Sequence, residues 1–152
     1  MSILASRLAA FYALPETSIK PSEFDALIEW IDAQYALIPC SVAFTGTEVT
    51  LAHCVEWCRR YDVLLISTAN SSHPFLSKRA NARFRAVHDW HHIMIGADST
   101  LRGEIAAFRY AKRSAPRNIH WLLFSEIVLQ AAACIHHGAF QPQRLVDAWG
   151  IL

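Results

Sequence analysis

The chain has 152 residues, of which 53% are hydrophobic and 18% are charged, and its formal net charge is +1. Such a length corresponds to one globular domain, and this composition excludes a disordered protein, which would be less hydrophobic and more highly charged. Uncharged apolar stretches, such as residues 127–135, are shorter than the roughly 18 residues of a membrane span. The N-terminal apolar stretch contains Arg7 and has no basic residue before it, so we interpret it as a helix of a cytoplasmic protein and not as a signal peptide.

Apolar residues recur at helical spacing along most of the chain. Residues 63–66 are the one credible strand, although a continuing helix fits nearly as well, and residues 67–76 have the composition of a loop. The sequence predicts a compact all-α domain of six or seven helices, one of them central and buried. The predicted helices cover residues 2–13, 21–37, 47–61, 77–95, 98–113 and 119–137, with a short last one over 142–149.

The predicted helix over 119–137 is apolar around nearly its whole circumference, which is typical of a helix that runs through the middle of a domain. Glu126, Gln130 and His137 are exceptions, and at 100° per residue they lie within about 40° of one another. A narrow polar stripe is therefore expected on a buried helix.

A second polar stripe is predicted on the helix over 77–95, beside its apolar face. His88 and His92 lie one turn apart in this stripe and point the same way. Two imidazoles at this spacing can converge on a single cation. The other members of the stripe are Asn81, Arg85 and Asp89.

Glu104 falls within the apolar face of the next helix. Burying an unpaired carboxylate is costly, so we expect Glu104 to pair with a base such as Arg85 or to bind a metal. The ligand types on these three helices are those of a zinc, manganese or iron site in a helical bundle. The alternative is a buried hydrogen-bond network without a metal, for instance His88 with Glu126 and Arg85 with Glu104. The expected constellation is His88, His92, Glu104 and Glu126, with Gln130 and His137 behind them.

Other histidines and the cysteines are interpreted as structural. His91 lies in the apolar face of its helix and is expected to be a core histidine. Cys54 and Cys58 share a helical face, but two thiols without a second pair are a weak sign of zinc. The sequence leaves open whether His53 or His73 joins the site.

Charge is unevenly distributed along the chain. Residues 1–77 carry four basic and eight acidic side chains, whereas residues 78–117 carry nine basic and three acidic ones. This basic middle raises the local potential for anions such as phosphates, although it could also be a solvated surface. Several of its members flank the helices with the candidate ligands: Lys78, Arg79, Arg83, Arg109, Lys112, Arg113 and Arg117.

The run from Asn81 to His92, between Ser-Ser-His-Pro and Gly103-Glu104, resembles a family of uncharacterised small proteins of tailed bacteriophages and prophages. Residues 124–130 and 138–142 extend the likeness over roughly residues 60–145. This resemblance implies a phage or prophage origin and does not specify a reaction.

The chain also resembles, more loosely, the HD superfamily of metal-dependent phosphohydrolases. Those proteins are all-α and use a histidine, a His-Asp pair and a distant aspartate as ligands. Because the match is to a two-residue motif, the resemblance implies a reaction class and not membership of the superfamily. The residues that follow the same order here are His53, His88, Asp89 and either Asp98 or Asp147.

These patterns predict a metal-dependent hydrolase that acts on a phosphate ester, a nucleotide or a nucleic acid. The metal would acidify a bound water, Glu104 would accept its proton as a general base, and Arg85 would neutralise the phosphate. The expected metal ligands are His88, His92 and Glu126, with Asp89 as a further or alternative ligand.

The alternative is a non-enzymatic phage accessory protein that binds a host protein, a nucleotide or a nucleic acid. Its contact surface would be the basic middle and the loop over 67–76, and the buried polar stripes would be purely structural.

Overall fold

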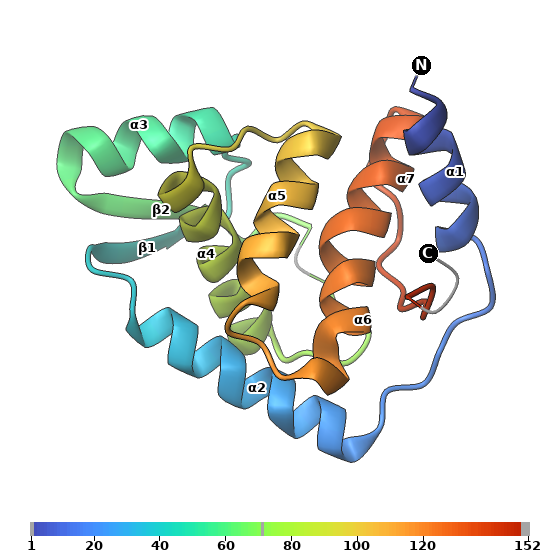
Figure 1. The fold of residues 1–152 in the computed structure, drawn as a ribbon. Helices are drawn as coiled ribbons and strands as arrows, with labels where there is room; N and C mark the ends of the chain where they lie inside the picture. Colours follow the sequence, from blue (N-terminus) through green and yellow to red (C-terminus); the bar gives the residue numbers. More distant parts are fainter. Residues whose placement is uncertain (1, 71, 150–152) are drawn as a thin grey trace.

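The computed structural model describes residues 2–70 and 72–149, and within them the chain is mostly helical (Figure 1). Six helices are present, if the last is counted as one continuous element, together with a two-stranded sheet. The first five helices are α1 (Ile3–Tyr12), α2 (Pro21–Ala36), α3 (Leu51–Tyr61), α4 (Lys78–Ile95) and α5 (Leu101–Lys112).

The last helix is continuous but not uniform. After a 3₁₀ turn, η1 (Arg117–Ile119), it consists of α6 (His120–Leu123), a π-helical segment η2 (Phe124–Leu129) and α7 (Gln130–His137). Figure 1 shows its C-terminal half between α5 and α1. The prediction of one central buried helix is confirmed, because Leu122, Leu123 and Leu129 on this helix are completely buried.

This helix is also the one candidate for a membrane span among the described residues. The stretch Arg117–His137 is long and apolar enough to cross a membrane, although it is not an uncharged run because it contains Glu126. However, 67% of its apolar window is buried inside the protein, as in the core helix of a globular fold.

Capping residues set both ends of α4. The hydroxyl of Ser77 accepts a hydrogen bond from the backbone N–H of Ala80 at the start of α4, and Gly96 ends α4 in the left-handed conformation, at φ +63°. The start of α3 was predicted too early, at Thr47. The helix begins at Leu51, because the hydroxyl of Thr50 provides the N-cap.

The all-α prediction was incomplete, because a parallel sheet is present. Strands β1 (Ser41–Thr45) and β2 (Val63–Ser67) pair side by side, with Ser41 opposite Val63 and Thr45 opposite Ser67. Helix α3 connects them in a βαβ arrangement. Strand β2 corresponds to the predicted strand, whereas β1 was missed because its sequence, Ser-Val-Ala-Phe-Thr, lacks the run of large apolar residues that marks β2.

The predicted helix over 142–149 was wrong, since residues 141–148 form neither helix nor strand. Side chains of other elements hold this segment instead. The hydroxyl of Tyr12 donates to the carbonyl of Pro142 at 2.9 Å and accepts from the backbone N–H of Arg144 at 3.0 Å. The hydroxyl of Ser125 accepts from the backbone N–H of Val146 at 3.0 Å. These bonds satisfy backbone groups that a helix would have paired internally.

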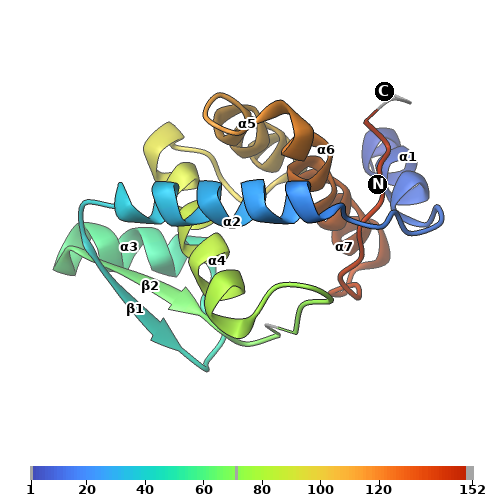
Figure 2. The same ribbon diagram turned by 90° about the horizontal axis from the view of Figure 1, so that it is seen from below.

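Two apolar clusters lie on opposite sides of α4 (Figure 2). The large cluster is formed mainly by α1, α2, α5 and the last helix, and α4 contributes Phe84 and Val87 to it. The small cluster has four buried residues, to which α4 contributes Ala86. Its other members, Cys54, Leu64 and Ile66, come from α3 and β2.

Candidate metal centre

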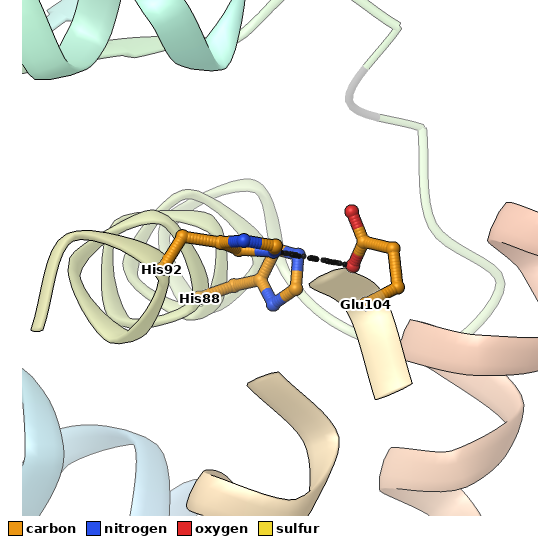
Figure 3. Close-up of side chains that lie close together, drawn as sticks. All are labelled: His88, His92 and Glu104. Carbon is orange, nitrogen blue, oxygen red and sulfur yellow. Dashed lines mark hydrogen bonds and ion pairs between the residues drawn. The ribbon is translucent and has the colours of Figure 1, made fainter. Parts of the chain in front are cut away.

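Three side chains from two neighbouring helices meet at the boundary between these clusters (Figure 3). His88 and His92 extend from α4, and Glu104 extends from the first turn of α5. Oε2 of Glu104 lies 3.0 Å from Nε2 of His88 and 3.3 Å from Nε2 of His92, and the two Nε2 atoms are 3.2 Å apart. His92 is 1% exposed and Glu104 is 9% exposed.

The short connection between α4 and α5 fixes this meeting. After Gly96 reverses the chain, the carbonyl of Ala97 accepts a hydrogen bond from Nδ1 of His92 at 3.2 Å. Thr100 then caps α5. Gly103 packs so closely on this connection that a Cβ there would overlap the carbonyl of Asp98. The first turn of α5, which carries Glu104, is therefore pressed against the end of α4.

The contact with Ala97 determines which nitrogen of His92 is available. A carbonyl can only accept, so Nδ1 of His92 carries the hydrogen, and Nε2 of the neutral ring presents a lone pair to His88 and Glu104. Metal-bound histidines commonly have this arrangement, in which the outer nitrogen donates to a carbonyl or carboxylate. While no ion is bound, Nε2 of His88 can donate its hydrogen to both Nε2 of His92 and Oε2 of Glu104.

The charges of the cluster stabilise one another. Burial alone would raise the pKa of Glu104, but the charge of His88 and its hydrogen bond to the carboxylate, with a smaller contribution from His92, outweigh burial and lower the pKa to about 2. Burial also acts to lower the pKa of His88, and the charge of Glu104 more than compensates, so this pKa is raised. Burial raises the pKa of the neighbouring Asp89.

The spacing of the three donor atoms matches that around a small metal ion. An ion with tetrahedral bonds of about 2.0 Å holds its ligand atoms about 3.3 Å apart, and the observed separations are 3.0, 3.2 and 3.3 Å. The group of His88, His92 and Glu104 could therefore hold a metal ion. Three protein ligands leave at least one coordination position for water or substrate, as in catalytic sites.

Two pockets are each bordered by Arg85, His88 and Glu104. The first, of about 290 Å³, lies toward the sheet and also contacts Asp89 and His92. Its wall includes residues that follow the two strands or end them: Val49, Leu51 and Ser67. The second, of about 230 Å³, lies toward the last helix and is also bordered by Glu126 and Gln130. We call these the sheet-side pocket and the helix-side pocket.

Of the two glutamates in the expected constellation, Glu104 lies beside the two histidines, whereas Glu126 pairs with another residue. Glu104, expected as a general base, is the carboxylate beside the two histidines. Glu126, expected as a ligand, accepts a hydrogen bond from Nε2 of His73 at 3.2 Å. The predicted pairing of His88 with Glu126 is likewise replaced by the contact of His88 with Glu104.

His73 is one of the two histidines whose place in the site the sequence leaves open, and its side chain is completely buried. It lies in the segment between β2 and α4, which has no helical or strand periodicity. The one available signal was a histidine in a stretch of small polar residues, which is weak. By contrast, His53 is exposed on α3.

Arg85 is close to the cluster but does not pair with Glu104. Its guanidinium donates to the carbonyls of Ser67 at 2.9 Å, Ala69 at 2.7 Å and Asn70 at 3.0 Å. It thereby fixes the chain as it leaves β2, and Arg85 is the only Lys or Arg among the described residues that border the two pockets.

The rest of the basic middle lies away from the cluster. Arg83 pairs with Asp32 and stacks over the ring of Tyr35. Near the C-terminal end of α5, the ammonium of Lys112 lies over Trp149 and the guanidinium of Arg113 over Tyr110. These cations interact with aromatic or acidic neighbours and do not surround the pockets.

The remaining predicted residues are also accounted for. Gln130 borders the helix-side pocket, as expected, but His137 is exposed at the C-terminal end of α7. Asp98 and Asp147, the possible last ligands of an HD-type site, are exposed as well. His91 is confirmed as a core histidine, 3% exposed and packed against Trp30 and Tyr110: burial lowers its pKa to about 4.

Comparisons with protein-family models, curated proteins and solved structures find no match to this chain. The site is therefore interpreted from its own geometry.

Proposed function

We propose that the protein binds one divalent transition-metal ion through His88, His92 and Glu104 and uses it for hydrolysis. The observation that carries this proposal is the triangle of donor atoms, with sides of 3.0–3.3 Å, formed by two imidazole nitrogens and one carboxylate oxygen. Two histidines and one glutamate form a ligand set used by catalytic zinc, and iron and manganese accept the same ligand types.

The surroundings suit a catalytic role better than a structural one. Structural zinc sites are closed by four protein ligands, whereas this group has three and borders two pockets. A bound ion would supply a water of lowered pKa. Ala97 orients His92 from behind, and the carboxylate of Glu104 offsets part of the ion's charge.

As substrate class we propose a phosphate ester, which includes nucleotides and nucleic acids. Arg85 supports this class, because it borders both pockets next to the ligands. A guanidinium has five N–H donors, and those that bind the carbonyls of Ser67, Ala69 and Asn70 leave others for an anion.

The proposal is tested first by metal content. Protein purified without a histidine tag and dialysed against zinc, manganese or iron(II) should retain about one ion per chain. His92→Ala and Glu104→Ala should each weaken binding at least about 100-fold, because even outer-shell changes cost 10–100-fold. His137→Ala is the matched control, since it removes an exposed imidazole outside the cluster.

Less than about 0.2 ion per chain with all three metals would end the proposal. If the ion binds, hydrolysis of bis(4-nitrophenyl) phosphate by the loaded protein tests the substrate class. A folded protein that binds no metal but co-purifies with a nucleic acid or a host protein would favour a non-enzymatic binding role instead.

A further inference from the structure

A second buried titratable pair lies beside the proposed metal centre and outside its ligand set. Nε2 of His73 and Oε1 of Glu126 are 3.2 Å apart, and the two side chains are 0% and 5% exposed. Burying a carboxylate and an imidazole together is costly unless they are well paired. Neither residue is needed to hold an ion at His88, His92 and Glu104.

The backbone fixes the direction of this hydrogen bond. Nδ1 of His73 accepts hydrogen bonds from the backbone N–H groups of Phe75, at 3.3 Å, and Leu76, at 3.0 Å. Because Nδ1 accepts, the hydrogen of the neutral ring is on Nε2, which donates to Oε1 of Glu126. Among the described residues, no hydrogen bond is made to the other oxygen of Glu126.

The helix around Glu126 is distorted in a way that often accompanies function. Residues Phe124–Leu129 are wound as a π-helix in the middle of an otherwise α-helical element. Single π-helical turns are rare and occur frequently at functional sites. Here the distorted turn carries Glu126 and Ile127 on the wall of the helix-side pocket, and Gln130 follows at its end.

The helix-side pocket connects this carboxylate to the proposed metal centre. It is bordered by Glu126 on one side and by His88 and Glu104 on the other. Its volume of about 230 Å³ exceeds that of a water molecule, about 30 Å³, several times over. A water and a small part of a substrate can therefore lie between the carboxylate and the cluster. Asp89, the other nearby acid, borders the sheet-side pocket instead.

We propose that Glu126 is the general base of the hydrolysis and that His73 is the residue that positions it. This inference rests on the proposed metal site. Glu126 takes a proton from the attacking water, whose O–H electron pair stays on the oxygen that forms the new bond to the substrate. As this bond to phosphorus forms, the bond between phosphorus and the leaving-group oxygen breaks, and the same proton passes from Glu126 to that oxygen. His73 holds the carboxylate through the hydrogen bond from Nε2.

The deciding experiment uses Glu126→Gln with cobalt(II) as the probe ion. Glutamine keeps an oxygen that accepts the hydrogen bond from His73, so the fold should be retained, which circular dichroism checks. Cobalt(II) affinity should stay within about twofold of the unchanged protein, since Glu126 is not a ligand. Hydrolysis of bis(4-nitrophenyl) phosphate should fall at least about 100-fold, the usual contribution of a general base.

A pH titration of the cobalt(II) absorption spectrum gives a readout that needs no substrate. The negative charge of Glu126 favours the protonated form of a nearby metal-bound water, so its removal should lower the titration midpoint by at least about half a pH unit. His73→Phe should change the midpoint and the pH profile of hydrolysis without changing cobalt(II) affinity. Glu56→Gln, an exposed glutamate on α3, is the matched control and should change nothing.

Each outcome separates this inference from the proposed function. If the unchanged protein does not bind cobalt(II), the proposed metal site fails. If it does but Glu126→Gln abolishes binding, Glu126 is a ligand and not a base, and the inference is overturned. An unchanged midpoint in Glu126→Gln would overturn it as well, whether or not the phosphodiester is hydrolysed.

Discussion

The regions on the two sides of α4 differ in how firmly they are built. On one side, α1, α2, α5 and the last helix bury a large continuous cluster that includes completely buried leucines. On the other side, the small cluster has four buried residues among those described, three from α3 and β2 and one from α4, surrounded by partly buried ones such as Val42 and Trp90. The outer face of α3 leaves Trp57 42% exposed. Stability is therefore concentrated on the side of α5 and the last helix.

The proposed metal centre lies where the two regions meet, and it uses them differently. Its three donor atoms come from α4 and α5, which are anchored by the large cluster. The segment from β1 to β2 contributes Val49, Leu51 and Ser67 to the wall of the sheet-side pocket. The difference indicates that the ligand geometry is held rigidly. The wall of the sheet-side pocket formed by the segment from β1 to β2 should move at a lower cost in free energy.

The largest expected effect tests this contrast directly. Leu123→Ala and Leu64→Ala each remove a completely buried leucine, one from each cluster. Such changes cost about 2–5 kcal/mol, depending on how far the neighbours relax. We expect the loss for Leu123→Ala near the upper end and that for Leu64→Ala near the lower end, because side chains around Leu64 are partly exposed. Urea unfolding measures both, and equal losses would contradict the contrast.

A smaller effect is expected at the connection between α4 and α5. A methyl group at position 103 would overlap the carbonyl of Asp98, so Gly103→Ala must push the first turn of α5 away from the end of α4. We expect a loss of about 1–3 kcal/mol in the free energy of unfolding. Metal affinity should also fall, because Glu104 moves with that turn.

Gly46→Ala is the matched control, because nothing lies within 4 Å of the added methyl group. It should change stability by less than about 0.5 kcal/mol and leave metal affinity as it is. Unfolding and metal titration of the two variants give the comparison, and an undisturbed Gly103→Ala protein would show that the connection does not set the site geometry.

A third prediction concerns pH. Above about pH 6.5, a rise in pH should lower the stability of the metal-free protein and raise its affinity for metal. The raised pKa of His88 gives the metal-free protein stability that is present below its ordinary value of 6.5 and is lost as pH rises through the raised value. The lowered pKa of Glu104 gives stability that is present above 4.5 and is lost as pH falls toward about 2. The pair thus stabilises the metal-free protein most between pH 4.5 and 6.5.

Metal binding requires the unprotonated imidazole, so affinity should instead fall by about tenfold per pH unit below the raised pKa of His88. Metal binding near neutral pH should release the proton of His88, and calorimetry in buffers of different ionisation enthalpy measures this release. Affinity that stays constant between pH 5.5 and 7.5 would contradict the placement of His88 among the ligands.

The sequence predicted much of the site because its residues repeat at helical spacing. His88 and His92 share a face because they are one turn apart, and Glu104 was recognised as an acid on an apolar face. Gln130 and Glu126 indeed border one pocket. These are local properties of single helices, and packing such faces together brings their polar residues into one place.

What the sequence did not predict depends on contacts between distant segments. The pairing of β1 with β2 and the anchoring of residues 142–146 by Tyr12 and Ser125 leave no periodic pattern. The burial of His73 depends on where a loop folds back over the last helix. The different partners of the two glutamates have the same origin, since helical spacing does not say which neighbouring segment a carboxylate will meet.

The hydrogen bond from His92 to the carbonyl of Ala97 has one more consequence. This hydrogen bond forms without a metal ion. Together with the close packing at Gly103, it preorganises the donor atoms. Unlike small zinc domains, whose chains fold only around their metal, this protein should survive treatment with a chelator as a folded molecule that reloads readily. Cells short of the metal would then accumulate a reserve of inactive protein, and activity would follow metal supply without new synthesis.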